Sequence, residues 1–418
     1  MKATSRSLSY TSLAMAVLAL CASLSAHAAD TFDGATNLLT LPSVSVGGGG
    51  SYTNVSVTLD SYTLLGVDNG VPVADSFDPS SNLLTLGAVV YQGNTYNNVR
   101  ITVNAYTVLS ATGGTASPGG PSTSQRIAAA TATAQSANNH CAAVAPFYWE
   151  IGDKTGVQAS GTVTSATDAT VYTANSLMSI ASASKWLYGA YVAQRRGGAL
   201  SDSDVKFLTF RSGYTNFSTC LPNQTIGSCA TYLTNGVHSN ATDGRFYYDG
   251  GHMQAHANLI GLGPLDNAGF AAEVGAQIGT DIGLHYSQPQ PAGGGVSSAS
   301  DYARFLRKLL GGNLAMANLL GTHAVCTNPT TCPRGEAVST PIPANESWHY
   351  SIGHWVEDDP VVGDGAFSSP GTFGFYPWID ASRTIYGIVA RKVDSGGGFD
   401  SALCGRQIRK AWVTAVPQ

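Results

Sequence analysis

The chain has 418 residues, a length that predicts two or three folding units rather than one small domain. Apolar residues make up 43% of the sequence and charged residues only 11%, so we expect a sizeable core and a surface made soluble by uncharged polar residues. The formal net charge is −5 and no stretch is rich in lysine or arginine, which excludes the electrostatic footprint of a nucleic-acid-binding protein.

Residues 1–28 have the pattern of an export signal. Two basic residues precede an apolar stretch over residues 13–24, and Ala26-His27-Ala28 supplies small residues for cleavage. We therefore expect a mature chain that begins near Ala29 and is secreted or periplasmic. No later stretch has about 18 uninterrupted apolar residues, so no membrane span is predicted.

Residues 29–110 contain an internal duplication. The segment Asp30-Thr-Phe-Asp returns as Asp75-Ser-Phe-Asp, and Tyr52-Thr-Asn-Val returns as Tyr96-Asn-Asn-Val. Apolar residues alternate in both copies, which is the period of a half-buried strand. The pattern predicts a small duplicated β-rich module that acts as a spacer or stabilising appendage, or alternatively contacts a polymer or surface.

The segment 111–125 is rich in Gly, Ser, Thr and Pro, a composition that predicts a flexible linker. Residues 126–418 mix helical stretches, such as Ser300 to Leu310, with strand-like stretches, such as Tyr386 to Val389. This mixture indicates an α/β or α+β domain.

Six cysteines follow the export signal, which itself contains Cys21. An even number in an oxidising compartment is typical of a disulfide framework, and the absence of two-residue ligand spacing argues against zinc. Two pairs of cysteines lie close together in the sequence, which suggests two disulfides within loops. Elimination then leaves the remaining two cysteines as the third pair. The predicted pairs are Cys220–Cys229, Cys326–Cys332 and Cys141–Cys404.

The segment Ser179-Ile-Ala-Ser-Ala-Ser-Lys-Trp carries the strongest candidate for chemistry. A helix that begins near Ser182 places Lys185 one turn further on the same face. A serine hydroxyl becomes a nucleophile when a nearby base takes its proton, and a lysine can be that base if burial or positive charge lowers its pKa. We expect Ser182 to be the nucleophile and Lys185 its proton acceptor.

Two other groups of residues have simpler interpretations. Ser203 and Lys206 repeat the same spacing, but we interpret their stretch as exposed, with Ser201 or Ser203 capping a helix. Acidic residues at 357–359 and Asp364 could bind calcium, although a solvated acidic loop is the simpler interpretation, and no metal site is predicted.

Four further segments, taken with the Ser182 motif, resemble the serine β-lactamase and penicillin-binding-protein superfamily, especially its class C-like esterases and amide hydrolases. The resemblance spans about residues 140–412. The four segments are Phe207-Leu-Thr-Phe-Arg-Ser-Gly-Tyr, Phe246-Tyr-Tyr-Asp-Gly-Gly-His, Ala292-Gly-Gly-Gly-Val-Ser-Ser-Ala-Ser-Asp-Tyr and Gly371-Thr-Phe-Gly-Phe-Tyr-Pro-Trp-Ile-Asp.

The resemblance implies a β-lactamase-like sandwich of an antiparallel sheet flanked by helices, with an all-helical region. It also implies an acyl-enzyme on Ser182 with Lys185 as base, and a proton relay through Tyr248, for which the neighbouring Tyr247 is the alternative. Backbone N–H groups of Ser182 and of the strand near Gly371 would bind the oxyanion.

The sequence departs from the family's pattern at two motifs. Tyr-x-Asn stands here as Tyr248-Asp249-Gly250, so the orienting amide is missing and His252 is a candidate substitute. Ser369-Pro370-Gly371 occupies the place of Lys-Thr-Gly, so the usual cationic partner of a substrate carboxylate is absent. Hydrolysis of an ester or amide is therefore favoured over antibiotic resistance.

The sequence thus predicts a secreted serine hydrolase that cleaves a carboxylic ester or amide, without a cofactor or metal. Its partner would be a small or oligomeric ester or amide substrate. The alternatives are a D-alanyl peptidase, a β-lactamase, an amide-oligomer hydrolase, or a non-catalytic domain of the penicillin-binding type.

Overall fold

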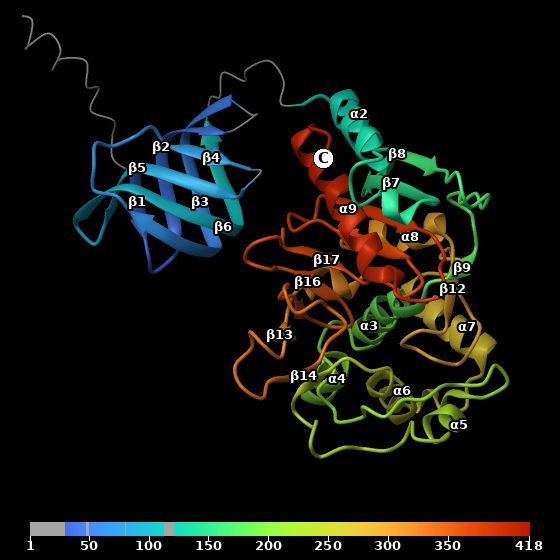
Figure 1. Ribbon diagram of the computed structural model, residues 1–418. Helices are drawn as coiled ribbons and strands as arrows, with labels where there is room; N and C mark the ends of the chain where they lie inside the picture. The colour runs from blue at the N-terminus through green and yellow to red at the C-terminus, as the bar shows by residue number, and fades with distance from the viewer. Residues whose placement is uncertain (1–29, 47–49, 80, 113–120) are drawn as a thin grey trace, which may run out of the picture. The chain divides into compact units, whose positions relative to one another are not determined.

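The structure, a computed structural model, describes residues 30–46, 50–79, 81–112 and 121–418. The predicted export signal therefore lies outside the described residues. The chain divides into two compact units, Met1–Gly120 and Pro121–Gln418 (Figure 1).

The first unit is a six-stranded sheet with the strand order β1-β2-β3-β6-β5-β4. The strands of residues 30–67 occupy one half of this order and those of residues 76–112 the other half, with β3 and β6 antiparallel at the centre. Each outer strand also pairs with a strand of the opposite half: β1 is parallel to β5, and β4 is parallel to β2. The bounds are β1 Asp30–Asp33, β2 Leu38–Val46, β3 Gly50–Val67, β4 Ser76–Asp78, β5 Leu83–Tyr91 and β6 Asn94–Thr112.

The core of this unit follows from the alternation seen in the sequence. Alternate residues of β3, such as Val55, Val57 and Leu59, are buried, as are Val99, Ile101 and Val103 of β6. These side chains pack into one apolar cluster.

Residues 111–125 were predicted to be a flexible linker, but regular elements reach into this segment from both ends. Strand β6 continues to Thr112, and helix α2 begins at Thr123 behind a capping box formed by Ser122 and Gln125. The capping pair was overlooked because it stands inside a Gly/Ser/Pro-rich stretch.

The second unit is a mixed α/β structure, as predicted. Its main sheet has eight strands in the order β13-β15-β16-β17-β18-β19-β7-β8, and the pairings are antiparallel throughout. The bounds are β7 Phe147–Asp153, β8 Gly156–Val163, β9 Met178–Ser179, β10 Phe246–Tyr247, β11 His285–Tyr286, β12 Gly295–Ser297, β13 Val325–Cys326, β14 Ala337–Ser339, β15 His349–Tyr350, β16 Trp355–Glu357, β17 Ala366–Ser368, β18 Tyr376–Ile379 and β19 Ile385–Ala390.

Helices cover both faces of the main sheet. The hydroxyl of Tyr386, on β19, bonds Arg307 of α8, whereas Val389 contacts α9 near Gly405. Because residues 386 and 389 point to opposite faces of a strand, α8 and α9 lie on opposite sides of the sheet (Figure 1). The bounds are α2 Thr123–Ala134, α3 Ser184–Arg195, α4 Asp202–Leu208, α5 Ile226–Ala230, α6 Gly251–Ala257, α7 Asn267–Ile278, α8 Ala299–Leu310 and α9 Gly397–Thr414, with short helices η1 Ala142–Val144, η2 Ala181–Ala183, η3 Asn258–Leu262 and η4 Ala315–Asn318.

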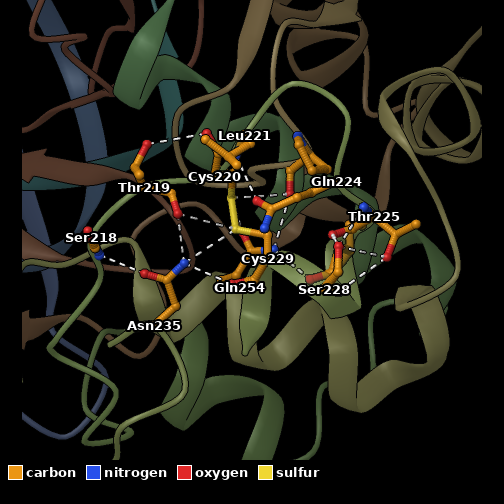
Figure 2. The surroundings of a disulfide bond; sticks show 12 residues. Ser218, Thr219, Cys220, Leu221, Gln224, Thr225, Ser228, Cys229, Asn235 and Gln254 are labelled. Atoms are coloured by element: carbon orange, nitrogen blue, oxygen red, sulfur yellow. Dashed lines mark hydrogen bonds between the residues drawn. A yellow bond between two sulfur atoms is a disulfide. The ribbon is translucent and has the colours of Figure 1, made fainter. Parts of the chain in front are cut away.

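Three disulfide bonds lie in the second unit. They join Cys141 to Cys404, Cys220 to Cys229 and Cys326 to Cys332, the pairs proposed from the sequence. Figure 2 shows the surroundings of the second of these. None of the described helices combines the length and the apolar character that crossing a membrane requires.

The acidic residues considered for calcium have protein partners in the structure. The Glu357 and Asp364 carboxylates both contact Arg409, whose side chain is almost fully buried. Asp358 pairs with His349, and Asp359 accepts backbone N–H groups. Glu357 and Asp359 are buried and stabilise the fold, whereas Asp364 is partly buried and Asp358 is exposed, so this stretch is a solvated loop only in part. The described residues include no cluster of three metal-binding side chains.

Candidate active site

Ser182 lies in the turn η2 that connects the short strand β9 to helix α3. Ala181, the residue before it, has a φ angle of 44°, in the left-handed region that non-glycine residues rarely adopt. The hydroxyl of Ser369 donates to the Ser182 carbonyl oxygen at 2.9 Å, and the hydroxyl of Tyr302 donates to the Ala183 carbonyl oxygen, also at 2.9 Å. Side chains from two distant segments thus fix the backbone around the serine.

Lys185 lies in the first turn of α3, beside Ser182. Its Nζ atom is 2.9 Å from the Oγ atom of Ser182. Helix α3 is buried on every side over residues 184–193, so the lysine amine lies inside the protein, while Ser182 stays partly exposed. Of the two side chains, only Ser182 is therefore in part accessible to solvent.

Burial lowers the pKa of the Lys185 amine to about 7, and the nearby carboxylate of Asp249 opposes this effect. At neutral pH a large fraction of the amine is then uncharged. An uncharged amine 2.9 Å from a hydroxyl can accept its proton, which is the property that the sequence analysis required.

The glycine-rich segment that begins at Ala292 contacts the side chains of Lys185 and Ser184. Lys185 Nζ donates to the carbonyl oxygen of Ala292 at 2.7 Å, and the backbone N–H of Gly295 donates to the hydroxyl of Ser184 at 3.1 Å. Strand β12, which starts at Gly295, pairs with β9 and so joins this segment to the nucleophile turn. The contact of Ala292 with Lys185 could not have been found from residue types, because it uses a backbone carbonyl.

Tyr248 is the tyrosine beside the reactive pair. Its ring centroid lies 4.9 Å from Lys185 Nζ, and the side chain of Ser182 acts to lower the pKa of its hydroxyl. Tyr247, the alternative relay residue, is the last residue of strand β10. Successive side chains along an extended chain point in opposite directions, so we expect Tyr247 and Tyr248 to point to different sides. Burial raises the pKa of Tyr248 to about 12, with the Ser182 side chain opposing the shift, so the phenol keeps its proton at neutral pH.

Asp249 is a half-buried acid to which the sequence analysis assigned no role. Its carboxylate accepts the N–H of Gly251 at 2.7 Å and that of Phe217 at 3.3 Å. Burial raises the pKa of this carboxyl group, and the charge of Lys185 opposes the shift. The interaction links Asp249 electrostatically to the lysine.

His252 does not replace the missing amide. Its Nδ1 atom lies 2.7 Å from the Ser212 hydroxyl, and its Nε2 atom lies 2.9 Å from the carbonyl oxygen of Tyr247. Its ring also stacks on Phe210, and burial lowers the pKa of the imidazole to about 3. Both nitrogens are occupied, so the role of His252 is structural.

The predicted oxyanion donor on Gly371 also requires correction. Its backbone N–H donates to the carbonyl oxygen of Phe375 at 2.7 Å and closes a turn, so it does not point at a substrate. Gly371 instead permits close packing, because a Cβ atom there would collide with the Ile180 carbonyl oxygen. Ser369 supports the nucleophile backbone and does not supply the missing positive charge.

The second Ser-x-x-Lys pair has a structural role. Ser201 caps α4 by accepting the N–H of Asp204 at 3.1 Å. Ser203 is exposed, and Lys206 forms an ion pair with Asp243 at 2.8 Å. An exposed lysine engaged with a carboxylate is unsuited to act as a base, so this pair offers a matched control for experiments.

No protein-family model matches the chain, and no curated protein matches it either. Several solved structures are similar to this chain. A β-lactamase from Mycobacterium bovis has 13% identity, with 65% of this chain and 96% of that chain covered, and a TM-score of 0.43. A D-stereospecific amidohydrolase from Streptomyces sp. has 11% identity, with 68% and 98% covered, and a TM-score of 0.45. Simvastatin synthase from Aspergillus terreus has 12% identity, with 69% and 97% covered, and a TM-score of 0.47.

The structural neighbours are thus described as β-lactamases, a penicillin-binding protein, an amidohydrolase and a synthase, and the similarity exists at the level of structure only. The chain covers nearly the whole length of the neighbours, whereas they leave about a third of this chain unmatched.

Proposed function

We propose that this protein is a serine hydrolase that cleaves a carboxylic ester or amide through an acyl-enzyme on Ser182. The observation that carries the proposal is the 2.9 Å distance between Lys185 Nζ and Ser182 Oγ, together with a lysine pKa of about 7. A hydroxyl beside an uncharged amine is an activated nucleophile.

The proposed reaction has two halves. In the first half, Oγ attacks the scissile carbonyl carbon, its proton moves to Lys185 Nζ, and the leaving group departs with a proton relayed through the hydroxyl of Tyr248. In the second half, water attacks the acyl carbon, its proton passes to the amine of Lys185, and the amine returns this proton to Oγ as the bond between Oγ and the acyl carbon breaks, so that Ser182 leaves as an alcohol. The phenol suits the relay because it remains protonated at neutral pH and can both donate and accept.

We further propose that the protein acts outside the cytoplasm. Three disulfides in the second unit fit an oxidising compartment, and the pattern of residues 1–28 fits an export signal. N-terminal sequencing of the exported protein tests this part, with a start near Ala29 expected.

The test of the hydrolase uses a panel of p-nitrophenyl esters, p-nitroanilides and nitrocefin, with kcat/KM as the readout. Ser182→Ala and Lys185→Met are each expected to lower kcat/KM on the best substrate at least about a thousandfold. Ser203→Ala and Lys206→Met, at the second pair, are the matched controls and should leave it unchanged. Equal activity in Ser182→Ala and the parent would overturn the proposal.

A further inference from the structure

Three large side chains in the second half of strand β3 face the core of the first unit. Residues directly opposite each other on paired strands point to the same face of a sheet. The partners of these three residues on β6 are all buried core residues, with Tyr62 opposite Val103, Leu64 opposite Ile101 and Val67 opposite Val99. The core-facing side of β3 therefore continues past Leu59, the last buried apolar residue of the strand.

The same three side chains are nevertheless exposed. The exposed fractions are 39% for Tyr62, 57% for Leu64 and 41% for Val67. Large apolar side chains on the core side of a strand are normally covered by the rest of the domain. The core of the first unit is thus left open at this end of the sheet.

The opening leads into a cavity of about 360 Å³. Buried core residues from both sequence copies line it, among them Leu39 and Leu86. Its less buried lining includes an aromatic group, in which the Phe32 ring packs at 5.9 Å from the ring of Tyr62 and at 5.8 Å from that of Tyr91. Every described residue that lines the cavity is aliphatic or aromatic, so the cavity suits an uncharged, apolar group.

The shape of the cavity favours a chain over a ring system. Leu59 and Val67 both line it and lie eight positions apart on β3, so at about 3.3 Å per residue the lining extends over roughly 25 Å of the strand. A volume of about 360 Å³ spread over this length is narrow. An apolar cavity of about 150 Å³ binds benzene, so by volume this one holds about ten to fourteen carbon atoms.

We propose that the cavity of the first unit binds the hydrocarbon chain of a fatty acid. The chain covers the apolar surfaces of Leu64 and Val67 and removes them from water, which supplies the binding free energy. The hydroxyl groups of the lining tyrosines are the polar groups available to the carboxyl end. The inference concerns the first unit and does not depend on Ser182.

The test titrates the full chain with 11-(dansylamino)undecanoic acid, whose emission increases in apolar surroundings, and then displaces this probe with dodecanoic acid. Leu64→Glu places a charge in the cavity and should weaken binding of the probe at least about tenfold. Val108→Glu is the matched control, because Val108 is the counterpart of Leu64 in the second sequence copy, is similarly exposed and is not among the lining residues. It should change the Kd less than twofold.

Val67→Glu, at a second lining position, should weaken binding as Leu64→Glu does, and circular dichroism of each variant checks the fold. Equal binding by the parent and by both cavity variants would mean adventitious association with exposed apolar side chains and would overturn the inference. Absence of binding by the parent, or an equal loss in Val108→Glu, would overturn it as well. Ser182→Ala should bind the probe as the parent does, so this result and the test of the hydrolase are independent.

Discussion

Lys185 Nζ lies 2.7 Å from the carbonyl oxygen of Ala292, a residue 107 positions further along the chain. An uncharged amine has two hydrogens and one lone pair. Because one hydrogen is directed at Ala292, the lone pair can face the hydroxyl of Ser182. The carbonyl therefore orients the amine, while burial lowers the pKa of the amine to about 7.

The pH dependence of activity should follow the lysine. Burial places the pKa of Lys185 at about 7, so protonation of the amine on acidification removes the base. We expect kcat/KM to fall below about pH 7 and to reach a plateau above pH 8. Tyr248, with a pKa of about 12, stays protonated across this range and adds no alkaline limb. A profile measured from pH 5 to 9.5 that is flat across pH 7 would contradict this assignment.

Replacement of Lys185 by methionine should separate activity from stability. The lysine pKa is about 7 in the folded state and about 10.4 in the unfolded chain, so between these values the unfolded state binds more protons. Stability of the parent relative to Lys185→Met should therefore rise with pH from 7 towards 10, by about 1.4 kcal/mol per pH unit. Denaturant unfolding of both proteins at several pH values measures this difference. A constant difference would show that the buried amine is not deprotonated on folding.

Asp249→Asn should move the acid limb to lower pH. The Asp249 carboxylate favours the charged form of Lys185, so its removal lowers the lysine pKa further. An asparagine Oδ1 atom can still accept the N–H groups of Gly251 and Phe217, which preserves the local backbone. The measurement is the pH profile of kcat/KM, and an acid limb that stays in place or moves to higher pH would exclude the interaction.

Among the disulfides, Cys141–Cys404 should contribute most to stability. It joins residues 263 positions apart, against separations of 9 and 6 for the other two. Loop-closure entropy grows with the length of the loop and amounts to about 5 kcal/mol for the longest one. Cys141→Ala/Cys404→Ala should lower the thermal midpoint more than Cys326→Ala/Cys332→Ala. The opposite order would mean that strain or residual structure dominates.

Local features of the second unit could be predicted from the sequence. Helix α8 begins at Ala299 and β19 spans Ile385–Ala390, close to the stretches expected from the periodicity. The spacing of Ser182 and Lys185 was sufficient to place them one turn apart, because helix geometry depends only on neighbouring residues.

Contacts that use the backbone or distant segments could not be predicted in the same way. The segments that contain Ala292 and Ser369 could be singled out from the sequence, but the contacts of the Ala292 carbonyl with Lys185 and of the Ser369 hydroxyl with the Ser182 carbonyl form only in the folded chain. Gly371 was misread because a glycine near a strand end fits both an N–H donor and a close-packed turn. The role of His252 could not be predicted because one of its two partners, Ser212, lies 40 residues earlier in the chain.

The most direct measurement of the central claim is the intact mass of the protein after exposure to a fluorophosphonate at a series of pH values. We predict one adduct per chain, located at Ser182 by peptide mapping, absent from Ser182→Ala, and formed faster as the pH rises through 7. An adduct on another residue, or no adduct at any pH, would contradict the claim that Lys185 activates Ser182.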